Sequence, residues 1–209
     1  MEVTLRQYIQ GLAVALPLVL VIFGFIQPAT AGILSTEEAL ADRILGDENA
    51  PLTIIEYSSL GCSHCKAFHQ GAFPMVKKEF IDTGKVRMIY RDFPLGARAM
   101  AAAMIARCAP EPRYFGMIDL FFTKQEEWSH AEDAMAALTK VAKFGGMTAS
   151  DVAECLQNQA LLDGIRDRAE TAKLDHGIAA TPSFLLGEEK IEGALSAEDF
   201  RDVIQKALD

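Results

Sequence analysis

Two cysteines separated by two residues, Cys62 and Cys65, are the clearest chemical signal in this chain. The motif Cys62-Ser63-His64-Cys65 can close a small disulfide ring. The first thiol can lie at the start of a helix, where unpaired backbone N–H groups favour an anion. A thiolate stabilised in this way is acidic and reactive. The motif therefore predicts thiol–disulfide exchange centred on Cys62.

The flanking residues supply the elements that position this pair. Leu52–Tyr57 is a short β-branched run that predicts a buried strand, and residues 58–61 are typical of a turn. From Cys62 the pattern predicts a helix through about Phe80, with a kink at Pro74. A strand, a tight turn, the cysteine pair and a helix together are the context of a redox motif, which is far more specific than the spacing alone.

Three other uses of the cysteine pair fit the sequence less well. A zinc site needs about four ligands. Cys62, Cys65 and His69 supply three, and no second Cys/His pair lies at zinc-ribbon spacing. Covalent haem attachment requires histidine directly after the second cysteine, where this chain has Lys66. A purely structural disulfide is the third alternative. We expect neither a metal nor a cofactor.

Two further side chains are candidates for a part in the thiol chemistry. His64 can stabilise the Cys62 thiolate by charge or by a hydrogen bond, and an exposed histidine without a role is the alternative. Glu56 lies on the predicted buried strand, where a carboxylate without a partner is costly, so we predict a proton relay below the disulfide. A carboxylate paired with a lysine, or at the strand edge, is the alternative. We expect His69 to be an ordinary surface or helix-packing residue.

The N-terminal residues have the pattern of an export signal. Residues 11–26 are almost wholly apolar, which is short for a membrane span and sufficient for a signal peptide. Ala29-Thr30-Ala31 offers small residues for cleavage before Gly32, although Arg6 is the only basic residue ahead of the apolar run. We predict that residues 1–31 are a cleaved signal peptide, with a retained N-terminal anchor as the alternative. Both place the remainder in an oxidising compartment.

The rest of the sequence predicts a single α/β domain with a helical insertion. A short helix from Glu37 to about Leu45 precedes the first strand, and Lys85–Arg91 is the second strand. Strand patterns return near the C-terminus and are followed by an amphipathic helix. The net charge of −9 argues against nucleic acid as a partner. We predict that the two halves of the domain, residues 32–94 and 178–209, share one sheet. Residues 95–177 are predicted to form an all-helical insertion between them. The predicted late strands are Thr181–Leu186 and Lys190–Glu192.

Cys108 and Cys155 both lie in the predicted insertion. Each belongs to the apolar face of a helix, judged by its spacing from Met100 and Met104 in one case and from Val152 and Leu156 in the other. We predict a second, structural disulfide between them. Two separate buried thiols, which are common in protein cores, are the alternative.

From about Asp42 to Leu208 the chain resembles the thioredoxin-like DsbA family of exported thiol–disulfide oxidoreductases. Ser63 stands where the commonest oxidase pattern has proline, whereas His64 keeps the second position of the dipeptide. The stretches that carry the resemblance are Ile55–Tyr57 leading to the cysteine motif, Tyr90–Pro94, and Thr181–Phe184.

The resemblance implies a fold, an activity and partners. The fold is thioredoxin-like, with a central mixed sheet flanked by helices, and Thr181 and Pro182 form a cis-proline loop that helps bind an extended substrate segment. Such a protein donates its Cys62–Cys65 disulfide to folding exported proteins in the periplasm. A quinone-linked membrane thiol oxidase reoxidises it.

Two alternatives to this activity stay open at this point. A disulfide isomerase or reductase of the same fold is the main one, and a non-catalytic binding module is the other. Isomerases often carry a dimer- or trimer-forming extension. Here about 19 residues separate Gly32 from Pro51, which favours a monomer.

Overall fold

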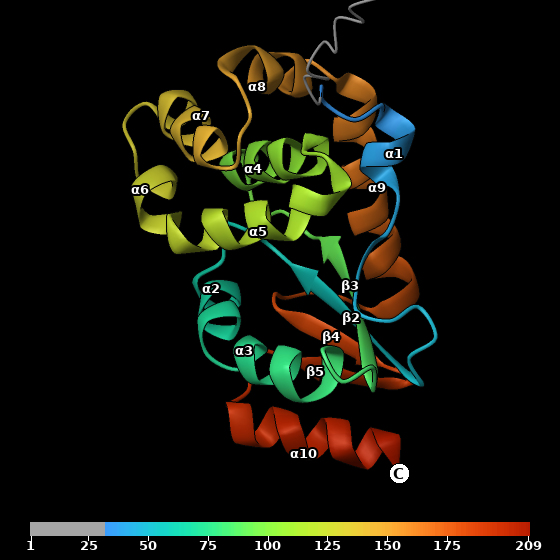
Figure 1. Ribbon diagram of the computed structural model, residues 1–209. Coiled ribbons are helices and arrows are strands. Elements are labelled where there is room, and N and C mark those ends of the chain that lie inside the picture. Colours follow the sequence, from blue (N-terminus) through green and yellow to red (C-terminus); the bar gives the residue numbers. More distant parts are fainter. Residues whose placement is uncertain (1–31) are drawn as a thin grey trace, which may run out of the picture. The chain divides into compact units, whose positions relative to one another are not determined.

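The computed structural model describes residues 32–209, which are drawn in colour in Figure 1. The predicted signal peptide or anchor, residues 1–31, lies outside the described residues. Within residues 32–209, no helix has both the length and the apolar character needed to cross a membrane.

The centre of the described part is a five-stranded sheet. Its strands are β1 (Arg43–Leu45), β2 (Leu52–Ser58), β3 (Val86–Asp92), β4 (Ser183–Leu186) and β5 (Glu189–Glu192), in the order β1-β3-β2-β4-β5. Strands β2 and β3 are parallel, with Ser58 opposite Asp92. The other pairings are antiparallel, so the predicted mixed sheet is confirmed.

The edge strand β1 takes the place of the second half of the helix predicted over Glu37–Leu45. Helix α1 (Thr36–Leu40) begins at a capping box, in which Ser35 and Glu38 each bond the other's backbone N–H. The helix ends after five residues. Arg43 then turns inward and donates a hydrogen bond to the carbonyl of Glu38. Pairing with β3 and the burial of Arg43 prevail over local helix propensity here.

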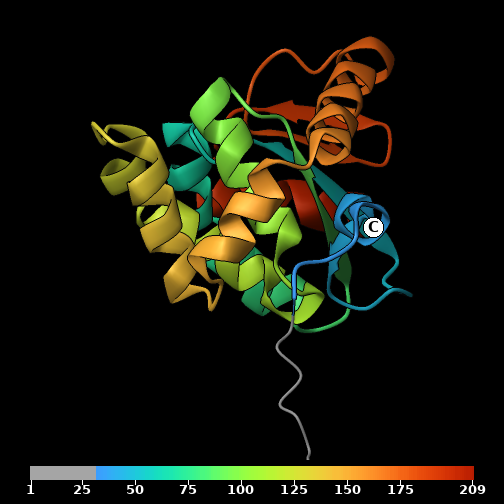
Figure 2. The same cartoon turned by 90° about the horizontal axis from the view of Figure 1, so that it is seen from above.

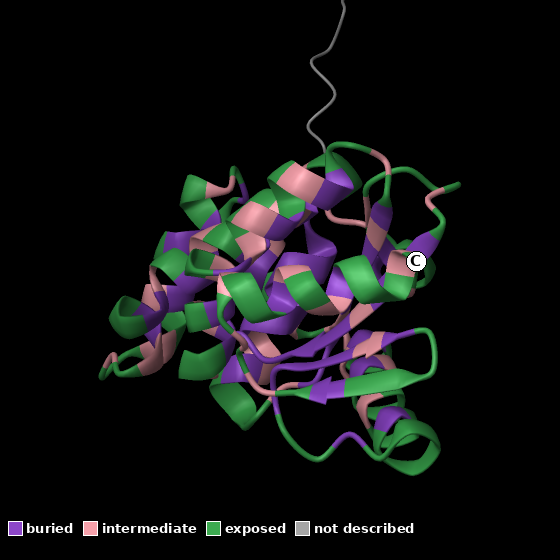
Figure 3. Ribbon diagram, turned by 90° about the horizontal axis from the view of Figure 1, so that it is seen from below, coloured by how far each residue is buried: buried purple, intermediate pink, exposed green. Residues whose placement is uncertain are grey.

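Three helices pack on one face of the sheet (Figure 1): α2 (Ser63–Gln70), α3 (Phe73–Val76) and α10 (Ala197–Leu208). The ring of Phe68 lies 4.6 Å from that of Phe184 in β4 and 5.3 Å from that of Phe200 in α10. Figure 3 shows buried residues along the central strands and exposed residues on the outer side of α10. This core fixes α2, and therefore the cysteine motif, against the sheet.

The long helix predicted from Cys62 to Phe80 is divided. Helix α2 ends at Gly71, and α3 continues into a π-helical segment, Lys77–Ile81. Pro74 lies in the first turn of α3, where a missing backbone N–H removes no helical hydrogen bond. The break is therefore placed before Pro74 rather than at it.

The helices of the insertion follow β3 and precede β4. Helix α4 runs through their centre (Figure 2) and packs against α5, α7, α8 and α9. Their common core includes Leu60 and Cys65, so the helical part covers the cysteine motif. Helix α9 also covers the second face of the sheet. The bounds are α4 (Ala97–Cys108), the 3-10 turn η2 (Glu111–Arg113), α5 (Tyr114–Thr123), α6 (Gln125–Ser129), α7 (Ala134–Phe144), α8 (Ala149–Leu156) and α9 (Gln159–His176).

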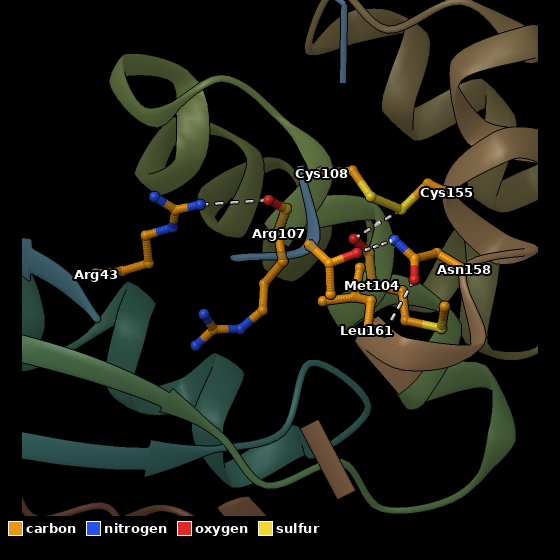
Figure 4. The surroundings of a disulfide bond; sticks show 8 residues. Arg43, Met104, Arg107, Cys108, Cys155, Asn158 and Leu161 are labelled. Atoms are coloured by element: carbon orange, nitrogen blue, oxygen red, sulfur yellow. Dashed lines mark hydrogen bonds between the residues drawn. A yellow bond between two sulfur atoms is a disulfide. The ribbon is translucent and has the colours of Figure 1, made fainter. Parts of the chain in front are cut away.

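Cys108 and Cys155 are joined by a disulfide in the structure (Figure 4). The S–S distance is 1.99 Å and the Cα atoms are 6.1 Å apart. The bond ties the end of α4 to α8 inside the helical core. Next to it, Arg43 donates a hydrogen bond of 3.3 Å to the carbonyl of Arg107, which links the disulfide region to the edge of the sheet.

Candidate active site

Cys62 is the N-cap residue of α2, with extended backbone angles of φ −90° and ψ 125°. Its side chain is partly buried, and its Sγ atom lies 3.3 Å from the carbonyl oxygen of Thr181. Cys65 follows in the first turn of the helix and is completely buried. The outer sulfur, that of Cys62, is therefore the one that another thiol can approach.

The surroundings of Cys62 lower the pKa of its thiol from an ordinary value of 9.0 to about 5. The largest cause is a hydrogen bond from the Cys65 side chain. The Thr181 side chain and the backbone N–H groups of Cys65 and His64 act in the same direction, while partial burial opposes them. Reduced Cys62 is therefore a thiolate at neutral pH.

The pKa of Cys65 moves in the opposite direction, far above its ordinary value. Burial is the largest cause, and the hydrogen bond to Cys62 adds to it, whereas the Ser58 hydroxyl lowers the pKa. Ser58 Oγ is buried and has no other hydrogen-bond partner within residues 32–209. The two thiols are chemically distinct: Cys62 is ionised while Cys65 keeps its proton.

Glu56 and His69 form a buried pair one helical turn from Cys65. His69 Nε2 lies 3.0 Å from Glu56 Oε1 and 3.2 Å from Oε2, and the side chains are 7% and 0% exposed. The imidazole also stacks on the ring of Phe122 in α5, with centroids 4.3 Å apart. The predicted burial of Glu56 agrees with the structure, but its partner is a histidine rather than a lysine.

His69 makes a buried contact with Glu56 that we do not predict from the sequence. We expect a surface or helix-packing residue there; the structure shows that His69 packs against aromatic rings and also contacts Glu56. A signal for it exists, because His69 follows Cys65 by four residues and so shares its helix face. The missing information is that this face looks toward Glu56, which only the packing of α2 on β2 determines.

His64 lies exposed in the first turn of α2. Its backbone N–H is one of the groups that stabilise the Cys62 thiolate. Among the described residues, the imidazole itself makes neither a hydrogen bond nor an ion pair. A contribution of its ring to the thiolate stays a prediction.

The loop before β4 completes the site. The Thr181-Pro182 peptide bond is cis, and the Thr181 carbonyl meets Cys62 Sγ. The Pro182 carbonyl accepts a hydrogen bond of 2.8 Å from the N–H of Gly193, which holds the loop against the chain that follows β5. The structure therefore places Thr181 and Pro182 beside the reactive sulfur. Their role in substrate binding stays a prediction.

Gln125 at the start of α6 is a positioning residue that the sequence does not reveal. Its buried amide donates hydrogen bonds to the carbonyls of Leu60 at 2.7 Å and Cys62 at 2.9 Å. The turn that carries Cys62 is thereby attached to the helical insertion. Nothing in the local pattern distinguishes this glutamine from a surface residue, since its partners lie 65 and 63 positions away.

The site as a whole holds two thiols with opposite pKa shifts, a buried carboxylate–imidazole pair and a loop beside the outer sulfur. Within residues 32–209, no group of three or more His, Cys, Asp or Glu side chains is arranged to hold a metal ion. A dithiol in which one sulfur is ionised and the other protonated is suited to thiol–disulfide exchange.

Comparison with known proteins agrees with this geometry. A family model described as thioredoxin matches residues 38–206. The crystal structure of alpha-DsbA1 from Wolbachia pipientis is 31% identical, with a TM-score of 0.75 over 84% of this chain and 96% of that chain. Oxidised BdbD from Bacillus subtilis has a TM-score of 0.72 over 85% of this chain and 96% of its own, but only 21% identity, and so bears on the fold alone.

A relative from Rickettsia conorii carries the name of a protein-disulfide oxidoreductase and is 27% identical over 169 residues. That match covers 80% of this chain and 61% of the relative, so the chain spans less than two thirds of that protein's length. The predicted thioredoxin-like fold is confirmed. The chain belongs to the thioredoxin family, and within it to the DsbA-type protein-disulfide oxidoreductases.

Proposed function

We propose that this chain is an exported dithiol oxidase, which donates the Cys62–Cys65 disulfide to folding proteins with free cysteines. The observation that carries the proposal is the pKa of Cys62, which is lowered to about 5. A stable thiolate favours the reduced form of the pair, so the disulfide form is readily given away. Isomerase or reductase work fits a weaker stabilisation of the thiolate.

In the first step, a substrate thiolate attacks Cys62 Sγ in the oxidised pair. The Cys62–Cys65 bond breaks, a mixed disulfide forms between the substrate and Cys62, and Cys65 leaves with the electron pair. Because the pKa of Cys65 is raised by burial, its sulfur then takes up a proton. The Ser58 hydroxyl faces this sulfur and stabilises the transient thiolate.

In the second step, another thiolate of the substrate attacks the substrate sulfur of the mixed disulfide. A substrate disulfide forms and Cys62 leaves as a thiolate, which its low pKa makes a good leaving group. The substrate dithiol loses two electrons and the cysteine pair gains them. The low pKa of Cys62 therefore favours release of the product.

The Glu56–His69 pair is the proposed proton relay for Cys65. The Glu56–His69 pair joins β2 to α2, and the contact of Ser58 with Cys65 joins the same two elements. Glu56 is two residues from Ser58 on the strand, and His69 is four residues from Cys65 on the helix. Residues at these spacings share a face, so the pair adjoins the sulfur that gains and loses the proton.

Thr181 and Pro182 are the proposed binding site for the substrate chain. In the reduced structure the Thr181 carbonyl oxygen lies 3.3 Å from Cys62 Sγ. Neither the Cys62 thiolate nor the mixed disulfide has a hydrogen to donate, so this carbonyl can accept a backbone N–H of the substrate. An extended segment next to the substrate cysteine would fit this arrangement.

Export and reoxidation complete the proposal. The apolar N-terminal run of the sequence supports export to the periplasm, and the family resemblance supports a quinone-linked membrane thiol oxidase as the partner that reoxidises a monomeric protein. Mass spectrometry of the protein from its native host tests export. A chain that begins at Gly32 is expected, whereas a full-length chain in the membrane fraction establishes the anchor.

The activity is tested with two forms of one small substrate protein. One form is reduced and unfolded, and the other is oxidised with scrambled disulfides. The oxidised chain is expected to form disulfides in the reduced substrate and to reactivate the scrambled one poorly. Cys62→Ser is expected to lose both activities. Faster reactivation of the scrambled substrate than oxidation of the reduced one would reject the oxidase in favour of an isomerase.

A further inference from the structure

A cavity of about 430 Å³ lies where α9 and the end of α4 face strands β2 and β3. None of the residues assigned above to the cysteine site lines it. It is therefore separate from that site. The volume is within the usual range of pockets for small molecules and is much larger than a single ion or water molecule requires.

The lining of the cavity carries more positive than negative charge. Arg91, Arg107 and Arg168 lie in its wall, against the two carboxylates of Asp42 and Asp92. Arg107 pairs with Asp92, while Asp42 is shared between Arg91 at 3.1 Å and Arg168 at 3.5 Å. One guanidinium charge of the wall is thus left without a carboxylate, in a chain whose net charge is −9.

Arg107 provides a fixed donor at the inner wall. Its side chain is only 2% exposed, its Nε atom donates to Asp92, and its Nη1 atom donates to the carbonyls of Ala39 and Ala41. Nη2 takes part in no hydrogen bond within residues 32–209. A ligand oxygen would give this donor a partner.

The rest of the wall suits a ligand with both charge and carbon atoms. Arg168 lies close to other positive charges. Its pKa is lowered first by burial and then by the charge of Arg107, whereas the charge of Asp42 raises it. Ile165 and Ala172 of α9 add apolar surface between the charged groups. Guanidinium groups bind planar carboxylates and phosphates through paired hydrogen bonds.

We propose that this cavity is a binding site for a small organic anion, whose carboxylate or phosphate group is held by Arg91, Arg107 and Arg168. The site is independent of the proposed oxidase function. Arg168 is the best residue for a test, because its side chain is 42% exposed and its one ion pair, with Asp42, is long. Arg166, on the same helix, does not line the cavity and is the matched control.

The experiment follows backbone amide NMR signals of the oxidised full chain during titration with citrate or inorganic pyrophosphate at constant ionic strength. We expect saturable shifts at Tyr57, Ala172 and His176 with at least one anion, and the anion that binds identifies the acidic group. Arg168→Gln should weaken binding about tenfold, which corresponds to the loss of one charge-assisted contact. Arg166→Gln should leave the affinity unchanged.

A second variant separates a specific contact from general charge. Arg168→Lys keeps the positive charge but loses the planar fork, so its affinity should lie between those of the wild type and Arg168→Gln. The absence of saturable shifts with both anions at millimolar concentration would overturn the proposal. Equal weakening by Arg166→Gln and Arg168→Gln would also overturn it, since this would show only non-specific attraction.

Discussion

The His69 Nε2 atom lies 3.0 Å from Glu56 Oε1, and this contact connects α2 to β2 one helical turn from Cys65. The Ser58 hydroxyl faces the Cys65 sulfur from the same strand, two residues further on. The ring of Phe68 lies edge-on to the imidazole of His69, with centroids 5.5 Å apart. The Glu56–His69 and Ser58–Cys65 contacts both join β2 to α2, which is consistent with the proposed proton relay to Cys65.

Removing the histidine should destabilise the fold. His69→Phe keeps an aromatic ring beside Phe122 but leaves the Glu56 carboxylate buried without its partner, which should lower the free energy of unfolding by about 3 kcal/mol. Glu56→Leu combined with His69→Phe removes both polar groups and should recover most of the loss. Urea unfolding of the oxidised proteins measures both values.

The exposed His130 is the control for this prediction. Its side chain is 76% exposed, so His130→Phe should change the free energy of unfolding by less than about 0.5 kcal/mol. An effect of His69→Phe as small as that of His130→Phe would show that the contact with Glu56 does not hold the site together.

The two cysteines should behave differently when replaced one at a time. Cys62→Ser removes the attacked sulfur and should abolish oxidation of thiols. Cys65→Ser leaves Cys62 without its resolving partner, so mixed disulfides with substrates should accumulate. Non-reducing electrophoresis and mass spectrometry detect such adducts. Failure to recover them with Cys65→Ser, under conditions where the wild type turns over, would refute these roles.

The reactivity of reduced Cys62 should depend on pH with a midpoint of about 5. Its folded pKa is below the unfolded value, so the thiolate stabilises the reduced fold fully above about pH 9, progressively less as the pH falls, and no longer below about pH 5. The ultraviolet absorbance of the thiolate, followed from pH 8 to pH 4, reports the midpoint.

Cys65→Ala tests the cause of this shift. The hydrogen bond from Cys65 is its largest cause, so the variant should raise the pKa of Cys62 toward 9.0. A pKa of Cys62 that stays near 5 in Cys65→Ala would instead assign the shift to Thr181 and the backbone N–H groups.

The Cys108–Cys155 disulfide should contribute stability without taking part in the exchange. Its loop spans 47 positions, for which loop-closure entropy gives roughly 4 kcal/mol as an upper figure. The double variant Cys108→Ala/Cys155→Ala should melt at a lower temperature and still oxidise substrates through Cys62 and Cys65. Thiol counting on the oxidised, denatured wild type checks the premise: two free thiols mapped to Cys108 and Cys155 would contradict it.

The main elements of the fold follow from local patterns. The β-branched run of β2, the turn before Cys62 and the capped helix α10 are all recognisable because each depends on neighbouring residues. Residues 43–45 are different. Their strand character comes from pairing with β3, more than forty positions away, and local propensity there favours a continued helix.

The candidate site divides in the same way. Cys62, Cys65 and the buried position of Glu56 are recognisable from spacing and pattern, because they lie in one local unit. The contacts of His69 with Glu56 and of Gln125 with the Cys62 turn are tertiary, and each needs the packing of separate elements to be known. The cluster of arginines around the α9 cavity likewise brings together three separate segments of the chain.

The reduction potential of the Cys62–Cys65 pair decides whether this protein is an oxidase. It is measured by equilibrating the protein in glutathione buffers of known ratio and quantifying the free thiols of Cys62 and Cys65. A thiolate stabilised as described should give a potential of about −120 to −180 mV, the range between DsbA and protein disulfide isomerase. A potential of about −200 mV or lower, toward glutaredoxin and thioredoxin, would contradict the oxidase.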